Sequence, residues 1–283
     1  MKERLLFTGG NGFIGRNLIP DLSDIFTVFS PRREELNLFC DDSIRDYLLT
    51  NKINYIIHSA NPNPSKNPLD ISERLLRDSL QMFMAIYQCK DCVKKIVYLG
   101  SGAIYDKTKD IISVSEEVML RSVPKDDYGF AKYIMEHMTS ENIYNLCLFG
   151  CYGPGDADSK FITHCIRCCL KHEPITIRQD CMFDYMHVSD LGKILTWIIN
   201  SEPKYNTYNA CSGKRISLLE IAQMVKRKMN SDMEIVILNE GWNKEYTGSN
   251  VRLLKEYNGD FLTIEKGIDI QIEWEKEHFE VGK

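Results

Sequence analysis

The run Arg4-Leu5-Leu6-Phe7-Thr8-Gly9-Gly10-Asn11-Gly12-Phe13-Ile14-Gly15 is the most informative part of the sequence. An apolar strand comes directly before closely spaced glycines, and an amphipathic helix begins near Phe13. Gly10, Gly12 and Gly15 fit the pattern G-x-G-x-x-G, and Gly9, Gly12 and Gly15 fit G-x-x-G-x-x-G. Glycine permits a sharp turn and a close approach of the backbone to a pyrophosphate, whose charge is stabilised at a helix N-terminus. The run predicts a dinucleotide-binding strand-turn-helix, and the alternative is a glycine-rich turn that binds nothing.

The composition is that of a globular protein with a large core. The chain has 283 residues and a formal net charge of −5, and its Lys and Arg residues are scattered. Scattered basic residues argue against nucleic-acid binding and against a membrane surface as partners. No apolar run approaches the roughly 20 residues of a membrane span, and the first strand begins too close to Met1 for a signal peptide. We therefore expect a soluble, cytoplasmic protein.

The ten cysteines do not form a recognisable metal or disulfide pattern. Cys89 and Cys92 lack a second pair at zinc-finger spacing, and Cys165, Cys168 and Cys169 lie in one helix-like segment without ligand partners. We expect free thiols and no metal.

The order of elements predicts an α/β fold with a Rossmann-type doubly wound parallel sheet. Nearly continuous apolar segments alternate with helices, as in parallel strands buried on both faces. These strands are expected at 25–30, 54–60, 95–100 and 145–149. We expect a dinucleotide-binding domain over 1–155 plus about 183–200, and a smaller C-terminal α/β substrate lobe over 156–182 and 201–283.

Further cofactor-binding candidates lie at the carboxyl ends of two predicted strands. Arg32 and Arg33 stand where an NAD-binding fold usually carries an acid for the ribose 2′-hydroxyl. Two guanidinium groups suit a 2′-phosphate instead, so the pair favours NADP(H), with NAD(H) possible. The alternative is that both arginines are solvated and paired with Glu34 or Glu35. Ser59 and Ala60 end the next strand at the same edge of the sheet.

A candidate catalytic group follows. Ser101 ends a predicted strand, and Tyr128 and Lys132 lie one turn apart on one face of a predicted helix. A free phenol has a pKa of about 10, and a neighbouring ammonium and an oxidised nicotinamide both favour the phenolate. Tyr128 can therefore exchange a proton while a hydride moves, with Ser101 bonding the substrate oxygen and Lys132 holding the nicotinamide ribose. The alternative is a helix-surface pair without function.

At this point the sequence resembles the extended short-chain dehydrogenases/reductases, in the branch of nucleotide-sugar epimerases, dehydratases and reductases. The resemblance covers essentially the whole chain. Besides the glycine run and Tyr128/Lys132, it rests on these motifs: Ser101 four residues before Tyr105, Tyr152-Gly153-Pro154-Gly155, Asp184-Tyr185-Met186-His187-Val188-Ser189-Asp190, Tyr208-Asn209-Ala210-Cys211-Ser212-Gly213, Val251-Arg252-Leu253-Leu254-Lys255 and Ile264-Glu265-Lys266-Gly267-Ile268. It implies catalytic Ser101, Tyr128 and Lys132, a nucleoside-diphosphate sugar as ligand, and a homodimer through helices near 70–90 and 130–145.

Departures from the family pattern narrow the expected activity. Dehydratases of this branch carry Asp-Glu after the active-site hydroxyl, where this chain has Gly102 and Ala103. The run 30–38 looks most like GDP-fucose synthases, which epimerise and reduce 4-keto sugars with NADPH. Their epimerising Cys and His are absent here, because Ala103 takes the Cys position and no His follows the Tyr-Gly-Pro turn. Hydride transfer at C4 remains.

Two departures concern the substrate. Phe183 replaces the arginine that usually grips the sugar-nucleotide diphosphate, and Gly150 replaces an asparagine. Arg167, Arg178 or Arg252 could supply the missing charge, or each could be a solvated surface arginine. With Gly102 and Ala103, these arginines are the substrate-binding candidates.

We thus expect an NADPH-dependent reductase of a 4-keto nucleoside-diphosphate hexose, acting in polysaccharide biosynthesis. The first alternative is an NAD-dependent C4 epimerase that uses the same triad. The second, of another class, is a non-catalytic dinucleotide sensor or scaffold.

Overall fold

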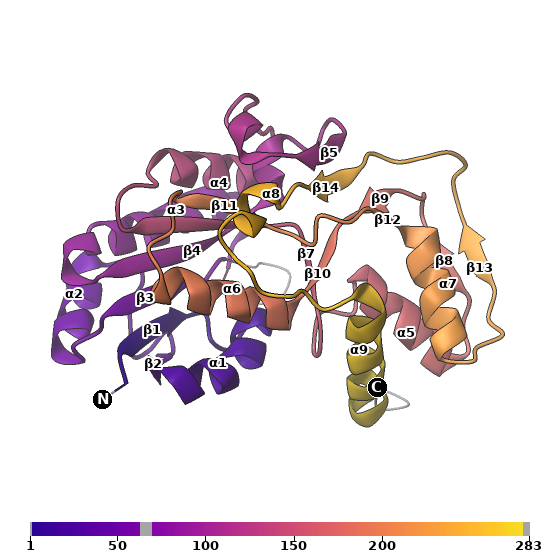
Figure 1. Ribbon diagram of the computed structural model, residues 1–283, viewed down its shortest axis with the longest axis horizontal. Helices are drawn as coiled ribbons and strands as arrows, with labels where there is room; N and C mark the ends of the chain where they lie inside the picture. The colour runs from indigo at the N-terminus through magenta and orange to yellow at the C-terminus, as the bar shows by residue number, and fades with distance from the viewer. Residues whose placement is uncertain (1, 63–69, 280–283) are drawn as a thin grey trace.

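A six-stranded parallel sheet forms the larger part of the molecule (Figure 1). The computed structural model describes residues 2–62 and 70–279. The strand order is β11-β6-β4-β3-β1-β2. In chain order the strands are β1 (Arg4–Thr8), β2 (Thr27–Phe29), β3 (Tyr55–His58), β4 (Lys95–Ser101), β6 (Ile143–Leu148) and β11 (Thr207–Ala210).

Helices cover both faces of this sheet. On one face, α1 (Phe13–Ile25) and α6 (Val188–Asn200) enclose a core with the buried side chains of Phe7, Ile57 and Leu146. On the other face lie α2 (Asp41–Thr50), α3 (Leu75–Tyr87) and α4 (Asp127–His137), around a second core. Burial on both faces explains the uninterrupted apolar strands, so the predicted fold class is confirmed.

The smaller lobe is built around three helices, α5 (Phe161–Lys171), α7 (Leu218–Lys228) and α9 (Ile264–His278), which share a separate core. A parallel pair, β8 (Ile175–Ile177) and β13 (Ile235–Ile237), lies on their outer side (Figure 1).

Between the large sheet and this lobe lie two small sheets. One pairs β7 (Gly150–Tyr152) with β10 (Tyr185–His187), and the other has the order β12-β9-β14-β5. Its strands are β5 (Ile111–Val114), β9 (Met182–Phe183), β12 (Ile216–Ser217) and β14 (Tyr246–Gly248), and the short helix α8 (Val251–Leu254) follows β14.

The structure differs from expectation in several elements. The strand β11, which we expected in the second lobe, pairs with β6 in parallel register and so extends the large sheet. The segment 106–123, which has no strand among those expected, contains β5, because β14 supplies its pairing partner from far along the chain. The helix expected near 69–90 is shorter, 75–87, and its expected start at residue 69 lies outside the described residues.

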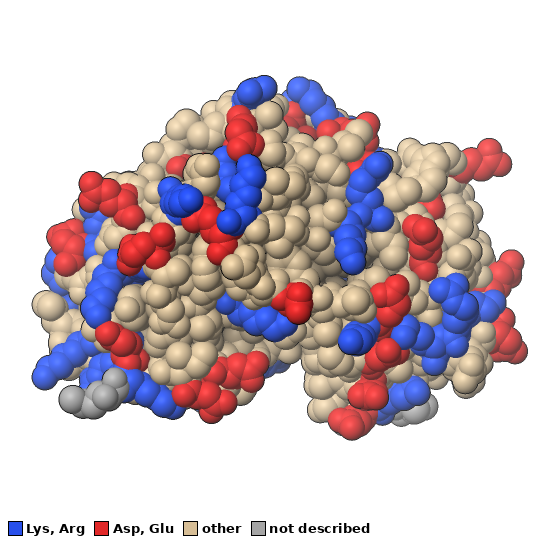
Figure 2. Space-filling model, viewed as in Figure 1, with Lys and Arg blue, Asp and Glu red and all other residues tan. Residues whose placement is uncertain are grey.

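All ten cysteines are free thiols. Within residues 2–62 and 70–279, no group of acidic, His and Cys side chains could hold a metal, and no helix is long and apolar enough to cross a bilayer. Basic and acidic side chains are interspersed over the face drawn in Figure 2, without a continuous stripe of one sign.

Candidate active site

The glycine turn is closely packed against its neighbours. Gly9 has φ +75°, and a Cβ there would lie 2.8 Å from the backbone nitrogen of Ala60. A Cβ on Gly15 would collide with the backbone of Gly10, and one on Gly10 would collide with the Ser30 hydroxyl. These contacts hold the end of β1 against the end of β3 and the start of α1. Substitution at Gly9 or Gly15 must therefore move backbone.

The N-terminus of α1 fits a pyrophosphate. Gly12 caps the helix without a side-chain hydrogen bond, and the first turn carries no acidic residue. The first backbone N–H groups of a helix have no intrahelical acceptor, so those of residues 13–15 are available to an anion. A Cβ on Gly12 would meet only the Gly9 carbonyl oxygen, at 3.1 Å, which leaves the outer side of the turn open.

The end of β3 is fixed by a buried polar pair. His58 is 5 % exposed, and its Nδ1 lies 2.9 Å from Thr8 Oγ1, which also accepts a bond from the Ala60 N–H. Burial and the nearby charge of Lys132 lower the His58 pKa to about 3, so the ring is neutral. His58 is thus a neutral, hydrogen-bonded histidine at the end of the strand, and it places Ser59 and Ala60 beside the glycine turn.

Arg32 and Arg33 are both exposed just beyond β2. The Arg33 guanidinium forms a 2.9 Å ion pair with Asp70, rather than with the expected Glu34 or Glu35. The Arg32 backbone N–H donates to Glu35. The pair therefore lies at the carboxyl edge of the sheet with the guanidinium groups toward solvent, and neither is buried.

Ser101, Tyr128 and Lys132 come together at the end of β4. Ser101 Oγ accepts a bond from the Ala103 N–H, and Ser101 is close enough to Tyr128 to act on the pKa of its phenol. Lys132, 6 % exposed, places Nζ 5.6 Å from the centre of the Tyr128 ring and donates to the Leu99 carbonyl at 3.0 Å. The helix α4 begins at an Asp126 cap and packs on the segment 102–105. The predicted side chains therefore share one site.

The electrostatics of this site differ from expectation in one respect. Burial raises the Tyr128 pKa above its ordinary value, and the hydrogen bond with Ser101 only partly opposes this. Burial also lowers the Lys132 pKa to about 8. We expected Lys132 to lower the pKa of the Tyr128 phenol, and this expectation was wrong for the protein without its cofactor. Desolvation of the phenolate is the dominant effect there.

A fourth side chain, Tyr246 of β14, also reaches the site. A Cβ on Gly102 would lie 2.5 Å from the Tyr246 hydroxyl and 2.9 Å from the Phe149 ring. Burial raises the Tyr246 pKa, and hydrogen bonding with the nearby Ser101 opposes this rise. Sequence reasoning missed it because Tyr246 belongs to no spaced motif with Ser101, and only the pairing of β14 with β5 and β9 brings it near.

The two departures at Gly150 and Phe183 are physically linked. A Cβ on Gly150 would lie 2.7 Å from the Phe183 ring and would collide with the Asp184 carbonyl oxygen. Phe183 also packs 5.1 Å from Tyr246, between ring centres. An aromatic side chain at 183 thus occupies space that an asparagine at 150 would require. Gly102 and Ala103 are buried directly after Ser101.

The three candidate arginines have different surroundings. Arg167 is paired with the buried Glu275 at 2.8 Å and with Asp158 at 2.5 Å. Arg252 is paired with Glu117 at 2.9 Å and contacts the Thr207 carbonyl. The structure does not bring these two together with the triad.

Arg178 directly follows β8. Its side chain is exposed, and within the described part of the chain it takes part in no ion pair.

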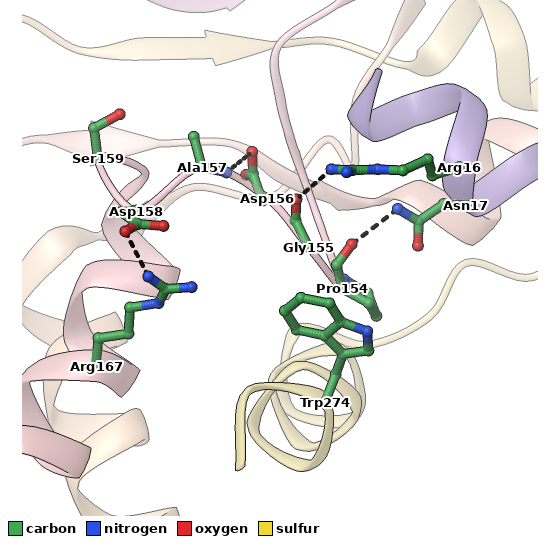
Figure 3. Close-up of a pocket in the computed structure, with 10 residues that line it drawn as sticks. All are labelled: Arg16, Asn17, Pro154, Gly155, Asp156, Ala157, Asp158, Ser159, Arg167 and Trp274. Carbon is green, nitrogen blue, oxygen red and sulfur yellow. Dashed lines mark hydrogen bonds and ion pairs between the residues drawn. The ribbon is translucent and has the colours of Figure 1, made fainter. Parts of the chain in front are cut away.

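A cavity of about 700 Å³ lies where α1, the 154–159 turn, α5 and α9 meet (Figure 3). Asn17 and Arg16 donate to the carbonyls of Pro154 and Gly155. None of the candidate catalytic side chains lines this cavity, and Arg167 is paired there with Asp158. It is distinct from the site at Ser101.

Known proteins resemble this chain in sequence and in fold. The chain is 26 % identical over 256 residues to a GDP-6-deoxy-D-talose 4-dehydrogenase of Aggregatibacter actinomycetemcomitans, covering 82 % of each chain. Its fold is similar to that of a GDP-mannoheptose C4 reductase of Campylobacter jejuni with NADP bound, with a TM-score of 0.82, 18 % identity and coverage of 97 % of this chain and 98 % of that one.

A Bordetella bronchiseptica enzyme solved with NAD and UDP gives a TM-score of 0.84 at 16 % identity, covering 98 % of this chain and 96 % of that one. Residues 5–211 match the model of the NAD-dependent epimerase/dehydratase family. With the match spanning most of the chain and both the glycine turn and the Ser-Tyr-Lys group, the protein belongs to the NAD-dependent epimerase/dehydratase family.

Proposed function

We propose that the protein is an NADPH-dependent reductase of a 4-keto nucleoside-diphosphate hexose. The observation that carries this proposal is the meeting of Ser101, Tyr128 and Lys132 at the carboxyl edge of the sheet that also holds the glycine turn. Bound NADPH supplies the hydride that reduces the substrate carbonyl at C4. The residues of the chain supply the proton, the orientation and the charge.

Tyr128 acts as the proton donor. Its raised pKa keeps the phenol protonated at neutral pH, so it can give a proton to the C4 oxygen as that oxygen gains charge. Ser101 donates a hydrogen bond to the same oxygen and stabilises the developing negative charge. Lys132, buried beneath the phenol, holds the ribose hydroxyls and stabilises the phenolate that remains.

Related enzymes support the choice of substrate class. The relative named above as a 4-dehydrogenase acts on a GDP-6-deoxyhexose, and the structural neighbour is named a C4 reductase of a GDP-heptose. In this chain Gly102 and Ala103 provide no acid or base for dehydration or epimerisation. Simple reduction at C4 is the reaction that needs no further group.

For the cofactor, the turn of α1 would hold the pyrophosphate, with Gly9, Gly10, Asn11, Gly12, Phe13, Ile14 and Gly15 around it and Ser59 and Ala60 facing it from β3. Arg32 and Arg33 would bind the 2′-phosphate of NADP, which requires Arg33 to exchange or share its contact with Asp70.

For the substrate, Arg178 is the candidate cation for the diphosphate, because Arg167 and Arg252 are already in ion pairs. The small lobe would hold the nucleotide. A homodimer through α3 and α4, a cytoplasmic location and a place in polysaccharide biosynthesis remain part of this proposal.

Cofactor binding separates this reductase from its alternatives. We expect purified protein to bind NADPH more tightly than NADH when each is titrated by nicotinamide fluorescence, and to lose that preference when Arg32 and Arg33 are both changed to Ala. NAD that stays bound through purification would instead indicate a C4 epimerase. Binding without any turnover of 4-keto sugar nucleotides would indicate a sensor or scaffold.

A further inference from the structure

We propose that Tyr246 is a positioning residue, which holds the Ser101 hydroxyl so that its single hydrogen is available to Tyr128 in the free enzyme and to the substrate oxygen once substrate is bound. This inference rests on the proposed reductase function and assigns a role to a side chain outside the Ser-Tyr-Lys group. It is carried by the placement of Tyr246 and by the hydrogen-bonding capacity of Ser101.

The backbone around Tyr246 is firmly held. The preceding residue, Glu245, forms a two-pronged ion pair with Arg215 at 2.7 and 2.6 Å, and its carbonyl accepts from the Ile111 N–H. The Tyr246 carbonyl accepts from the Asp184 N–H at 3.2 Å. A planar guanidinium bound through two nitrogens restricts orientation as well as distance. Tyr246 is therefore attached to both β5 and β9 where it projects toward Ser101.

The ring of Tyr246 lies among residues that leave room for it. It packs 5.1 Å from both Phe149 and Phe183, between ring centres. A Cβ on Gly102 would meet the Tyr246 hydroxyl, and a Cβ on Gly248 would lie 2.7 Å from the Phe149 ring. The absent side chain at Gly102 thus has a specific use, because any larger residue would displace the hydroxyl from Ser101.

The hydrogen-bonding capacity of the Ser101 hydroxyl limits which of its neighbours can donate to it and which can accept from it. A serine hydroxyl has one hydrogen to donate and can accept two. The Ala103 N–H already donates to Ser101 Oγ at 3.2 Å. The Tyr246 hydroxyl lies against the neighbouring Gly102, and hydrogen bonding with Ser101 lowers the pKa of both Tyr128 and Tyr246. If Tyr246 donates, the Ser101 oxygen has accepted two bonds, and its single hydrogen is left for the reacting groups. That hydrogen then serves Tyr128 before substrate binds and the C4 oxygen of the substrate afterwards.

The same arrangement accounts for the unusual pair at Gly150 and Phe183. Phe183 forms one side of the space around Tyr246, and Gly150 makes room for Phe183. An arginine and an asparagine at these two positions would replace the apolar contacts of the Tyr246 ring. In this chain, the two departures therefore serve the placement of a phenol beside Ser101.

Changing Tyr246 to Phe removes the hydroxyl and keeps the ring. The matched control is Tyr185→Phe, because the Tyr185 ring also packs on Phe183, with 4.9 Å between the ring centres. We expect Tyr246→Phe to lower kcat for reduction of a 4-keto nucleotide sugar roughly tenfold, the usual effect of one lost hydrogen bond, with KM little changed. The control should keep wild-type kcat.

The pH dependence of the reduction rate distinguishes a positioning role of Tyr246 from a general disturbance of the structure by the substitution. The charged and titratable groups around Tyr128 are Lys132 on its own helix, Asp126 and Lys107 at the helix start, Cys147 on β6 and Tyr246. Only Tyr246 changes in the variant. Without it, Ser101 stabilises the Tyr128 phenolate less, so the pH limb assigned to Tyr128 should move to higher pH. The proposal is contradicted if Tyr246→Phe keeps the wild-type kcat and the pH limb assigned to Tyr128 stays at its wild-type position.

A readout without turnover completes the test. In crystals of the NADPH complex, Tyr246 Oη should lie within hydrogen-bond distance of Ser101 Oγ, and in Tyr246→Phe the Ser101 side chain should rotate or recruit a water. A Tyr246 hydroxyl that points away from Ser101 in the wild-type complex overturns the inference. Wild-type protein that reduces no 4-keto nucleotide sugar overturns the proposed function instead, while these crystals still decide the role of Tyr246.

Discussion

The Lys132 ammonium lies 5.6 Å from the centre of the Tyr128 ring and donates its hydrogen bond to the Leu99 carbonyl. It is thus close enough to influence a negative charge on the phenol without bonding to it. Burial works on the two groups in opposite directions, because it raises the pKa of Tyr128 and lowers that of Lys132. Both effects favour the uncharged forms until a ligand brings its own charge.

Removing the Tyr128 hydroxyl tests its role as proton donor. We expect Tyr128→Phe to lower kcat by roughly 10²–10⁴-fold, the usual contribution of a positioned acid, while NADPH binding stays near its wild-type strength. Tyr133→Phe, on the same helix, is the matched control and should keep its activity. Steady-state kinetics and fluorescence titration measure both properties. A Tyr128→Phe enzyme with normal kcat would exclude the phenol as the donor.

The buried Lys132 ammonium is expected to lower the stability of the fold although the proposed reaction requires it. Its folded pKa of about 8 is below the ordinary 10.5, so the protonated form opposes folding. This penalty is complete below about pH 8 and disappears as the pH rises toward about 10.5. We expect Lys132→Met to be inactive and yet more stable at neutral pH, by ~1–2 kcal/mol after the loss of the Leu99 bond.

Denaturant unfolding at neutral and at alkaline pH checks this. The advantage of the Lys132→Met variant should shrink as the pH rises through that window. An inactive variant that is less stable at neutral pH would show that the ammonium contributes to folding.

The contact between Gly150 and Phe183 predicts a destabilising substitution. Gly150→Ala places a Cβ against the Phe183 ring and the Asp184 carbonyl, and we expect it to lower the free energy of unfolding by ~2 kcal/mol or more. Phe183→Ala relieves one of the two collisions. A double-mutant cycle should therefore show that the combined cost is smaller than the sum of the single costs. Additive costs would mean that the two positions are independent.

The glycine turn predicts a specific loss of cofactor binding. Gly15→Ala meets the backbone of Gly10, which cannot move aside, so we expect NADPH affinity to fall by at least ~10-fold along with stability. Gly192→Ala on α6 is a helical control, because its Cβ meets only the end of the Leu18 side chain, at 2.9 Å. Wild-type NADPH binding by Gly15→Ala would exclude this turn as the pyrophosphate site.

Local patterns were enough to predict much of the fold and the triad. The strand-turn-helix of residues 4–15 and the i, i+4 pair Tyr128 and Lys132 depend on residues that are close in sequence. Ser101 was recognisable because it ends a buried strand. In each case periodicity and turn chemistry act over a few residues, where a single sequence is informative.

Long-range pairing was not predictable in the same way. The strand β14 becomes a strand only beside β5 and β9, so nothing local indicated that Tyr246 would reach Ser101. The pairing of Arg33 with Asp70 likewise joins residues separated along the chain. The sign of the Tyr128 pKa shift depends on burial, which spacing alone does not give.

Transfer of deuterium from labelled cofactor tests the central claim most directly. Purified protein would be incubated with a 4-keto nucleoside-diphosphate 6-deoxyhexose and with NADPH that carries deuterium in place of both hydrogens at C4 of the nicotinamide, and the product would be analysed by NMR. The account predicts one deuterium at C4 of the sugar for each NADPH oxidised, and a transfer rate lowered roughly 10²–10⁴-fold in Tyr128→Phe. Product without deuterium at C4, or conversion without NADPH consumption, would contradict it.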